Sequence, residues 1–171
     1  MPPSSLCGMR NTGSCWQIRY NLETTDIHIR EISPEETYPI RHEILRPGRP
    51  LKEVQFEGDF EPTTFHLGAF LQEKLVGIAT YVKNPHKDFE PTEQYQLRGM
   101  AVLPEVQKMH LGQRILLAGE TILREKKNTR FLWCNARETA VDFYRKNNYQ
   151  THGDYFEIPN VCTHIVMYKR L

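Results

Sequence analysis

The sequence has no long apolar run and no strong excess of charge. Its longest uninterrupted apolar stretch, near Ile115 to Ala118, is far too short to span a membrane. Residues Met1 to Met9 have neither a basic start nor an apolar segment, so we expect no secretory signal and a cytoplasmic location. A non-specific nucleic-acid binder needs concentrated basic charge, whereas the net charge here is +1. We therefore expect neither a membrane nor a nucleic acid as a partner.

The spacing that marks a metal site is also missing. The four cysteines form no Cys-x-x-Cys pair, and no His-x-x-x-His pair accompanies them. We therefore predict that the protein binds no metal. Cys134 and Cys162 lie in strand-like segments, which predicts that both are reduced residues of the core.

Two common phosphate-binding motifs are absent, but another phosphate-accepting pattern is present. The sequence has no Gly-x-x-x-x-Gly-Lys-Ser/Thr and no Gly-x-Gly-x-x-Gly. Instead, Leu97 to Leu103 reads as a strand that stops at Pro104, and Gly112 opens a helical pattern. A helix start offers unpaired backbone amides and a partial positive charge, to which phosphate binds readily. Three cationic or potentially cationic side chains surround this start: Lys108, His110 and Arg114.

Hydrophobic patterning predicts one mixed α/β domain at 26–171. Residues 1–25 lack clear periodicity and are predicted to be a flexible N-terminal extension, although Trp16 to Tyr20 alternates as a strand would. Strands are predicted at 27–32, 66–71, 75–82, 97–103, 130–135, 150–157 and 164–169. Helices are predicted from Ser33, as the N-cap, to Leu45, from Gly112 onward, and at 139–147.

The order of these elements also predicts how the centre of the sheet is built. The strand–helix–strand unit from Leu97 to Asn135 should pair its strands in parallel with a right-handed crossover, while the other neighbours are hairpins. The loop-rich stretch from about Arg46 to Thr64 is long for a compact domain, which is typical of functional loops.

A family resemblance appears at the strand–loop–helix unit. There, Val102-Leu103-Pro104 precedes Gln107-Lys108-Met109-His110-Leu111-Gly112. This stretch resembles the pyrophosphate loop of the GNAT superfamily of acyl-CoA-dependent N-acetyltransferases, whose signature is Gln/Arg-x-x-Gly-x-Gly/Ala after Val-x-Pro. Gln107 and Gly112 match this signature, while His110 replaces its first glycine.

Two further stretches resemble the same family. Asn135 to Tyr149 is similar to its later Ala-x-x-Phe-Tyr motif, with Asn148-Tyr149 in place of Gly-Phe. Asparagine tolerates left-handed backbone, so it suits this helix end. The tail from Phe156 to Met167 resembles the small bacterial ElaA-like members. The resemblance covers about Ile27 to Leu171.

The resemblance implies a fold, a cosubstrate and a set of binding residues. The fold would be a GNAT-like single domain with a mixed, mostly antiparallel sheet, whose central parallel strand pair is splayed for acyl-CoA. The cosubstrate would be acetyl-CoA, with no metal, and the acceptor would be an amine. The implied cofactor-binding residues are Met100, Ala101 and Val102 for the acyl-pantetheine, Gln107, Lys108, Met109, His110, Leu111, Gly112, Gln113 and Arg114 for the pyrophosphate, and Asn135 for the pantetheine amides.

Tyr144 is the implied catalytic residue, because it occupies the tyrosine position of the later motif. Acetyl transfer from a thioester to an amine releases a thiolate. The pKa of a thiol is near ~8.5 and that of tyrosine near ~10, so the proton transfer is uphill by only about 2 kcal/mol. A positioned phenol is therefore able to act as the general acid.

The sequence does not identify the general base or the acceptor. It also does not decide whether the protein is an active enzyme. Candidates for the base are His164, His66, Glu57 and Asp59. A small-molecule amine, a peptide N-terminus and a protein lysine all remain possible acceptors, and a homodimer remains possible. The alternatives to an enzyme are an acyl-CoA-binding or regulatory module of the same fold, which the substitution at His110 favours, and an unrelated α/β protein that binds another phosphate ligand.

Overall fold

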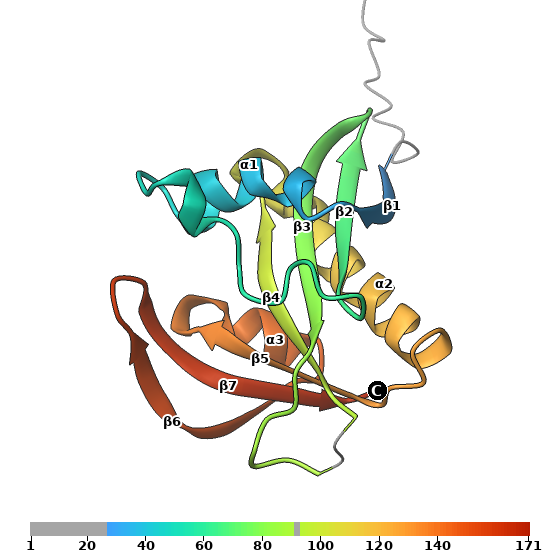
Figure 1. The fold of residues 1–171 in the computed structure, drawn as a ribbon, viewed down its shortest axis with the longest axis vertical. Helices are drawn as coiled ribbons and strands as arrows, with labels where there is room; N and C mark the ends of the chain where they lie inside the picture. Colours follow the sequence, from blue (N-terminus) through green and yellow to red (C-terminus); the bar gives the residue numbers. More distant parts are fainter. Residues whose placement is uncertain (1–26, 91–92) are drawn as a thin grey trace, which may run out of the picture.

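The computed structural model describes residues 27–90 and 93–171, and these form a single twisted sheet with helices on both faces (Figure 1). The predicted extension at 1–25, including Trp16 to Tyr20, lies outside the described residues. The strands of the sheet follow the order β1-β2-β3-β4-β5-β7-β6. Their bounds are β1 Ile27–Ile32, β2 Phe65–Leu71, β3 Lys74–Lys83, β4 Tyr95–Val102, β5 Phe131–Arg137, β6 Gln150–Ile158 and β7 Cys162–Arg170.

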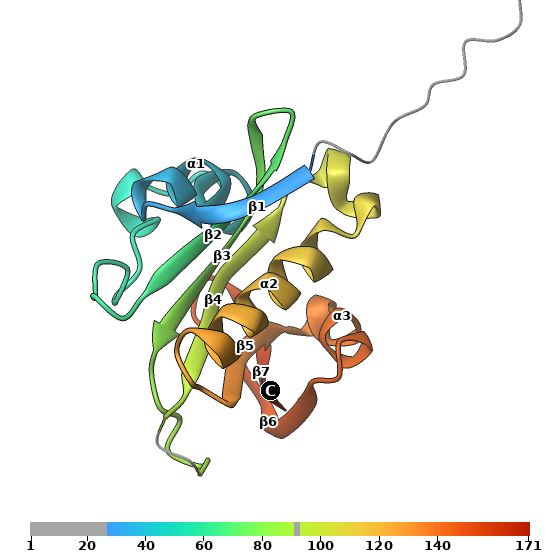
Figure 2. The same ribbon diagram turned by 90° about the vertical axis from the view of Figure 1, so that its right-hand side faces the viewer.

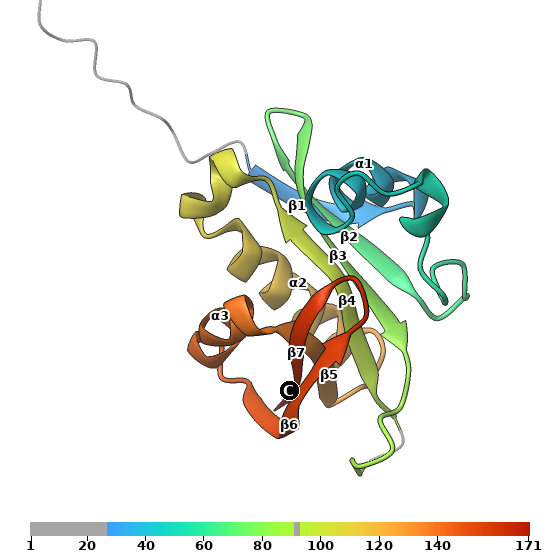
Figure 3. The same cartoon turned by 90° about the vertical axis from the view of Figure 1, so that its left-hand side faces the viewer.

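Helices α2 (Leu111–Glu125) and α3 (Val141–Lys146) lie on one face of the sheet (Figure 2). The segment that contains α1 (Tyr38–Ile40) lies on the other face (Figure 3). Each face has its own apolar core, and Ile115, Leu116 and Leu123 of α2 are fully buried in the first. Burial of side chains of this size stabilises a fold by roughly 1.5–3 kcal/mol each, so α2 is firmly docked.

The segment predicted as a helix from Ser33 to Leu45 is helical but not regular. It consists of a 3₁₀ turn η2 (Glu35–Thr37), the short α1 and a π-helical turn η3 (Arg41–Leu45). The predicted cap is present, because the Glu36 backbone amide donates to Ser33 Oγ at 3.4 Å and the Ser33 amide donates to Glu36 Oε2 at 2.7 Å. The predicted helix is therefore present to Leu45, but its hydrogen-bond pattern changes along its length, and Pro39 supplies no backbone donor in its middle.

The other predicted strands and helices are present, with ends shifted by a few residues. The 3₁₀ turns η4 (Leu51–Glu53), η5 (Pro104–Met109) and η6 (Glu138–Ala140) lie between them. Cys134 and Cys162 are free thiols, as expected, but only Cys134 is buried in the core. No helix within residues 27–90 and 93–171 combines the length and the hydropathy that a membrane crossing requires.

The centre of the sheet forms a fork, which confirms the predicted splayed parallel pair. β4 and β5 run parallel, but they are paired only where Tyr95 to Leu97 lie beside Leu132 to Cys134. Beyond this point the strands diverge, and β4 bends through an irregularity in its pairing with β3. Gly99 lies at the bend with φ +57°, and a Cβ there would lie 2.9 Å from the Phe56 ring. Only glycine fits this position without strain.

Candidate functional site

A cavity of about 770 Å³ occupies the fork between β4 and β5. It reaches both faces of the sheet, because α2 and α3 line it from one side and the segment after α1 lines it from the other. Nine of the residues predicted for the site line this cavity: Met100, Ala101, Val102, Gln107, His110, Gly112, Gln113, Asn135 and Tyr144.

Four residues predicted to bind the cofactor do not line the cavity. The Leu111 side chain is fully buried in the core beside β3, and Met109 packs against the same cluster. Arg114 donates from Nη2 to the Ile27 carbonyl at 3.3 Å, so it points toward β1. Lys108 is exposed on η5. These positions follow from the helical repeat of α2, which turns only some side chains of the loop and first turn toward the fork.

The start of α2 leaves its first backbone amides without a side-chain cap from any of the described residues, and its first turn contains no acidic residue. His110 is the N-cap and has left-handed backbone, with φ 56° and ψ 22°. Glycine adopts this conformation without strain, whereas it costs histidine roughly 1–2 kcal/mol. This difference explains why the GNAT pyrophosphate loop has a glycine at this position. The backbone of this loop therefore keeps its shape despite the His110 side chain.

The left-handed backbone predicted at the end of the later motif is confirmed. Asn148, which replaces the glycine of the later motif, has φ 68°. It follows Asn147, the C-cap of α3, and its amide donates to the Arg145 carbonyl at 3.0 Å. Asparagine is one of the few residues that adopt this conformation readily, so the end of α3 is preserved.

Gly112 lies between the fork and α3. A Cβ added there would lie 3.4 Å from the Met100 methyl group and 3.5 Å from the Phe143 ring, which is ordinary contact. A small side chain therefore fits at Gly112 sterically, although it would point toward the space that the predicted pyrophosphate needs. On the neighbouring loop, Gln107 Nε2 donates to the Val102 carbonyl at 3.4 Å and ties η5 to the end of β4.

The Tyr144 side chain extends from α3 to the place where β4 and β5 diverge. Its hydroxyl lies 3.9 Å from Met100 Sδ on β4 and contacts the Cys134 thiol on β5. Burial raises the pKa of Tyr144 well above its ordinary value, and the neighbouring Cys134 and Tyr81 add to this. Burial also raises the pKa of the Cys134 thiol to about 12. Tyr144 therefore carries its proton at neutral pH and is a donor at this position.

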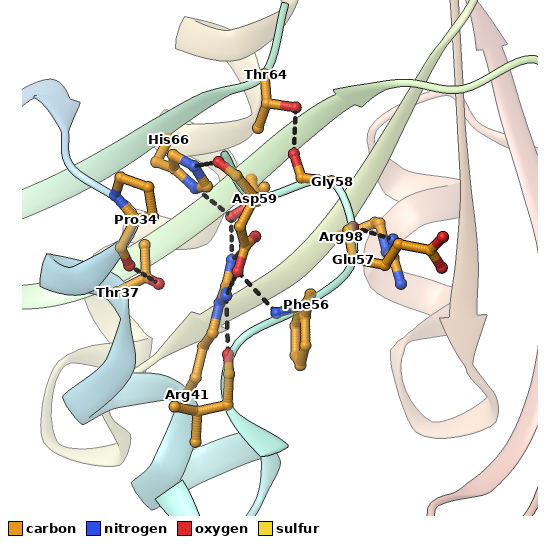
Figure 4. Close-up of polar contacts among 12 residues, drawn as sticks. Pro34, Thr37, Arg41, Phe56, Glu57, Gly58, Asp59, Thr64, His66 and Arg98 are labelled. Atoms are coloured by element: carbon orange, nitrogen blue, oxygen red, sulfur yellow. Dashed lines mark hydrogen bonds and ion pairs between the residues drawn. The ribbon is translucent and has the colours of Figure 1, made fainter. Parts of the chain in front are cut away.

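Three of the four candidates for the general base lie outside the cavity. Asp59 is buried in an ion pair with Arg41, whose guanidinium also donates to Thr80 Oγ1 at 2.7 Å (Figure 4). His66 is held by the same network, with its ring nitrogens 2.8 Å from Thr80 Oγ1 and 2.9 Å from the Asp59 carbonyl. Glu57 is exposed. Asp59 and His66 therefore help to hold the segment after α1 against the sheet.

His164 is the candidate base that lines the cavity. Its Nδ1 lies 2.7 Å from the Cys162 carbonyl, which only accepts, so Nδ1 carries the proton and donates it. Burial lowers the pKa of His164, and the positive charges of Arg137 and Arg46 lower it further, although the bond to Cys162 opposes this. The imidazole is therefore neutral at pH 7, and its Nε2, which lies 4.0 Å from Cys162 Sγ, carries the lone pair that would accept a proton.

Sequence reasoning missed a cationic group in the cavity wall. Arg46, Arg98 and Arg137 line it together with the Phe56 ring. These residues come from η3, β4, β5 and the loop after η4, so no motif of adjacent residues marks them. The length of the loop from Arg46 to Thr64 was the available signal, and Phe56 lies within it.

The described residues contain no group of three or more His, Cys, Asp or Glu side chains arranged to hold a metal ion.

Comparison with known proteins identifies relatives of this fold and sequence. Residues 27–149 match the model of the Acetyltransferase (GNAT) family. The chain is 34% identical over 145 residues to YitI of Bacillus subtilis (strain 168), described as an uncharacterized N-acetyltransferase, covering 85% of this chain and 97% of that protein. Escherichia coli ElaA has a similar structure, with a TM-score of 0.66 and 16% identity over 84% of this chain and 99% of ElaA. Ard1 from Thermoplasma volcanium also has a TM-score of 0.66, with 16% identity over 85% and 98% of the two chains.

Proposed function

The chain belongs to the GNAT family of acetyltransferases, and from this premise we propose that it transfers an acetyl group from acetyl-CoA to a primary amine. The observation that carries the proposal is the fork itself. It brings an uncapped helix start, two open strand edges, a protonated tyrosine and a neutral histidine to one cavity.

The donor would enter from the face of the sheet that α2 and α3 cover. Its pyrophosphate would bind the amides at the start of α2, where the helix dipole favours an anion. Beyond Leu97 and Cys134 the facing edges of β4 and β5 are not paired with each other, so their backbone groups are available to the pantetheine amides. Met100 to Val102 and Asn135 are among the residues that line the cavity along these edges.

The chemistry would take place at the point of the fork. The amine nitrogen attacks the thioester carbonyl, and the resulting tetrahedral intermediate expels the thiolate. Tyr144 gives its proton to the sulfur, and burial raises the pKa of a thiolate released there as well as that of the phenol. The pKa values of an unperturbed thiol and an unperturbed tyrosine differ by about 1.5 units, or roughly 2 kcal/mol. This difference is therefore a fair measure of the free energy that the proton transfer costs.

His164 would take the proton that the amine loses. A lysine-like amine needs about 4–5 kcal/mol to deprotonate at pH 7, whereas an α-amine needs about 1 kcal/mol. A neutral imidazole with a pKa below its ordinary value is a weak base, so it suits an amine that is itself weakly basic.

Release of free thiol from acetyl-CoA in the presence of a panel of amines tests the proposal. Steady release that depends on an amine, with the acetylated amine as the product, supports it. Tight binding of CoA by calorimetry without any release of thiol would favour the binding or regulatory module instead. Tighter binding of another nucleotide than of CoA would favour the unrelated phosphate-binding protein.

Substitution of Gly112 by aspartate should weaken CoA binding at least tenfold, which calorimetry would measure. A Cβ at Gly112 makes only ordinary contacts, and a carboxylate in the first turn favours the helix, so we expect the variant to fold. The same carboxylate would repel the pyrophosphate at close range. Gly112→Ala is the matched control, because it adds the Cβ without the charge. Equal CoA affinity in a folded Gly112→Asp variant would remove the site from the start of α2.

The rate of acetyl transfer should fall on the acid side, at a pH below the ordinary histidine pKa of about 6.5. The pKa of His164 is lowered in the folded protein, so its base form is present above that depressed value and is lost as the pH falls through it. Below it, the rate should fall about tenfold per pH unit.

The amine substrate titrates too, at its own higher pKa, so the test is the pH profile of kcat/KM for wild type and His164→Gln. The fall in kcat/KM that is caused by protonation of His164 should be absent from the variant. The fall that is caused by protonation of the amine should remain. A low-pH limb that persists unchanged in His164→Gln would assign the base to water or to another group.

A further inference from the structure

Three arginines lie together at the mouth of the cavity that opens beneath the segment after α1. Arg46 follows η3, Arg98 lies on β4 and Arg137 ends β5. Each of them contacts the same segment, because Arg46 and Arg137 donate to the Leu45 carbonyl at 3.0 and 3.4 Å, and Arg98 donates to the Glu57 carbonyl at 2.8 Å. We call these three residues the arginine cluster.

The arginine cluster has no carboxylate partner among the described residues. None of its three guanidinium groups lies within 4.0 Å of a carboxylate oxygen, and no aspartate or glutamate lines the cavity. The acidic groups of the same segment are engaged or face solvent. Asp59 is paired with Arg41 and Glu53 with Arg49, while the exposed Glu57 acts on Arg98 only through space.

Burial and mutual repulsion act on these charges. Burial lowers the pKa of Arg46, and the positive charges of Arg49 and Arg137 lower it further, against the attraction of Glu53 and Cys162. Burial also lowers the pKa of Arg98, against the attraction of Asp59 and Glu57. The folded protein therefore holds like charges together in a partly desolvated wall, and an anion that binds there would offset this repulsion.

The cluster is held in a fixed arrangement. The Phe56 ring lies under two of its guanidinium groups, 5.3 Å from Arg46 and 5.8 Å from Arg98. The ring is itself anchored, because the Phe56 amide donates to Asp59 Oδ2 at 2.7 Å (Figure 4). Side chains fixed in this way lose little entropy when they bind a ligand.

We propose that the acceptor amine carries an oxyanion, either a carboxylate or a phosphate, and that the arginine cluster binds it. This inference rests on the proposed acetyl transfer. The phosphates of the donor belong at the start of α2, on the opposite face of the sheet, so they leave the cluster to the acceptor. Guanidinium groups match carboxylate and phosphate oxygens with paired hydrogen bonds. The same wall disfavours an acceptor whose only charges are positive, such as a polyamine.

The register of the sheet also limits the length of the acceptor. Arg137 on β5 lies directly opposite His164 on β7. Side chains opposite each other in an antiparallel pair have their Cβ atoms about 4.5–5.5 Å apart. The positive charge of Arg137 also acts on the His164 imidazole, so an anion on this guanidinium would lie near the group that would take the amine proton. The acceptor is accordingly a short molecule, with only a few bonds between its anion and its amine.

Matched pairs of amines test the inference and separate its two sources. The carboxylate pair is β-alanine and β-alaninamide, and the phosphate pair is O-phosphoethanolamine and ethanolamine. The full chain is assayed by thiol release from acetyl-CoA, with kcat/KM compared at several pH values, because the anion also changes the amine pKa. The anionic member of one pair should be the better substrate, and that pair identifies the oxyanion.

Arg98→Gln and Arg137→Gln should each lower kcat/KM for the anionic amine about 10- to 100-fold, mainly through KM, and should affect the neutral amine far less. The comparison is made at a pH well above the His164 pKa, because loss of the Arg137 charge raises that pKa. Arg145→Gln is the control, because this exposed arginine on α3 lies outside the cavity. CoA affinity by calorimetry should stay constant in all three variants.

Each contrary result has its own meaning. If the variants lose CoA affinity, the cluster serves the donor and the inference is wrong. If the neutral amines are acetylated as well as the anionic ones and the variants change nothing, acetyl transfer stands and the inference fails alone. If no amine causes thiol release, the proposed acetyl transfer fails and the inference fails with it.

Discussion

Replacement of Tyr144 by phenylalanine should slow acetyl transfer by about 10²-fold or more, the scale expected for loss of a general acid. The substitution keeps the ring, which packs on the core between α3 and the sheet, and removes only the hydroxyl beside Met100 and Cys134. Stability and CoA affinity should therefore change little. The right measurement is a single-turnover experiment, because slow product release would hide the change in the steady state.

Tyr155→Phe is the matched control for this prediction. Tyr155 is 48% exposed on β6 and does not line the cavity, so its hydroxyl should be dispensable. A Tyr144→Phe enzyme with the single-turnover rate of wild type would assign the proton transfer to water or to another residue. A variant that loses CoA binding as well would show that the hydroxyl holds the donor in place.

Replacement of Arg41 by methionine should lower the free energy of unfolding by about 3–5 kcal/mol, the cost of leaving a buried charge without its partner. The Arg41 side chain is fully buried, and its two terminal nitrogens donate to both oxygens of the Asp59 carboxylate. The substitution would strand that carboxylate in the interior. It would also remove a donor from Thr80 Oγ1 and from the Val54 carbonyl. Urea unfolding followed by circular dichroism would measure the loss.

An exposed ion pair provides the control for the Arg41 prediction. Lys74 and Glu105 lie 3.3 Å apart with side chains that are 66% and 54% exposed, so Lys74→Met should cost no more than about 1 kcal/mol. The double variant Arg41→Met, Asp59→Asn should lose less than the sum of the two single variants, since the stranded charge is gone. Additive losses would show that the two residues stabilise the fold independently.

Local sequence patterns were enough to predict most of the helices and strands, because alternation and helical spacing depend only on residues that are close together in the chain. Ile27–Ile32 alternates and is β1, and the polar hairpin after Leu71 joins β2 to β3. The right-handed crossover predicted the parallel pair of β4 and β5. The segment from Ser33 to Leu45 is helical as predicted, but its irregularity was not predicted. Its start was predicted from Ser33, while the effect of Pro39 within it was overlooked.

The candidate site was predicted in part. The motifs at Gln107 to Gly112 and at Phe143-Tyr144 lie in continuous stretches of sequence, so they were recognisable, and both reach the cavity. Whether Tyr144 and Gly112 have the roles assigned to them remains a prediction. The side chains of Lys108, Met109, Leu111 and Arg114 were assigned with the loop, but the rotation of α2 turns them elsewhere.

The sequence by itself determined the order of strands and helices, the central crossover and the phosphate-accepting start of α2, since each depends on residues close together in the chain. Only the tertiary structure decided which candidate base reaches the cavity. Asp59 and His66 are buried in the network of Arg41, whereas His164 lies at the fork. Only the tertiary structure brought Arg46, Arg98 and Arg137 together, because residues so far apart in the chain become neighbours only when the sheet forms.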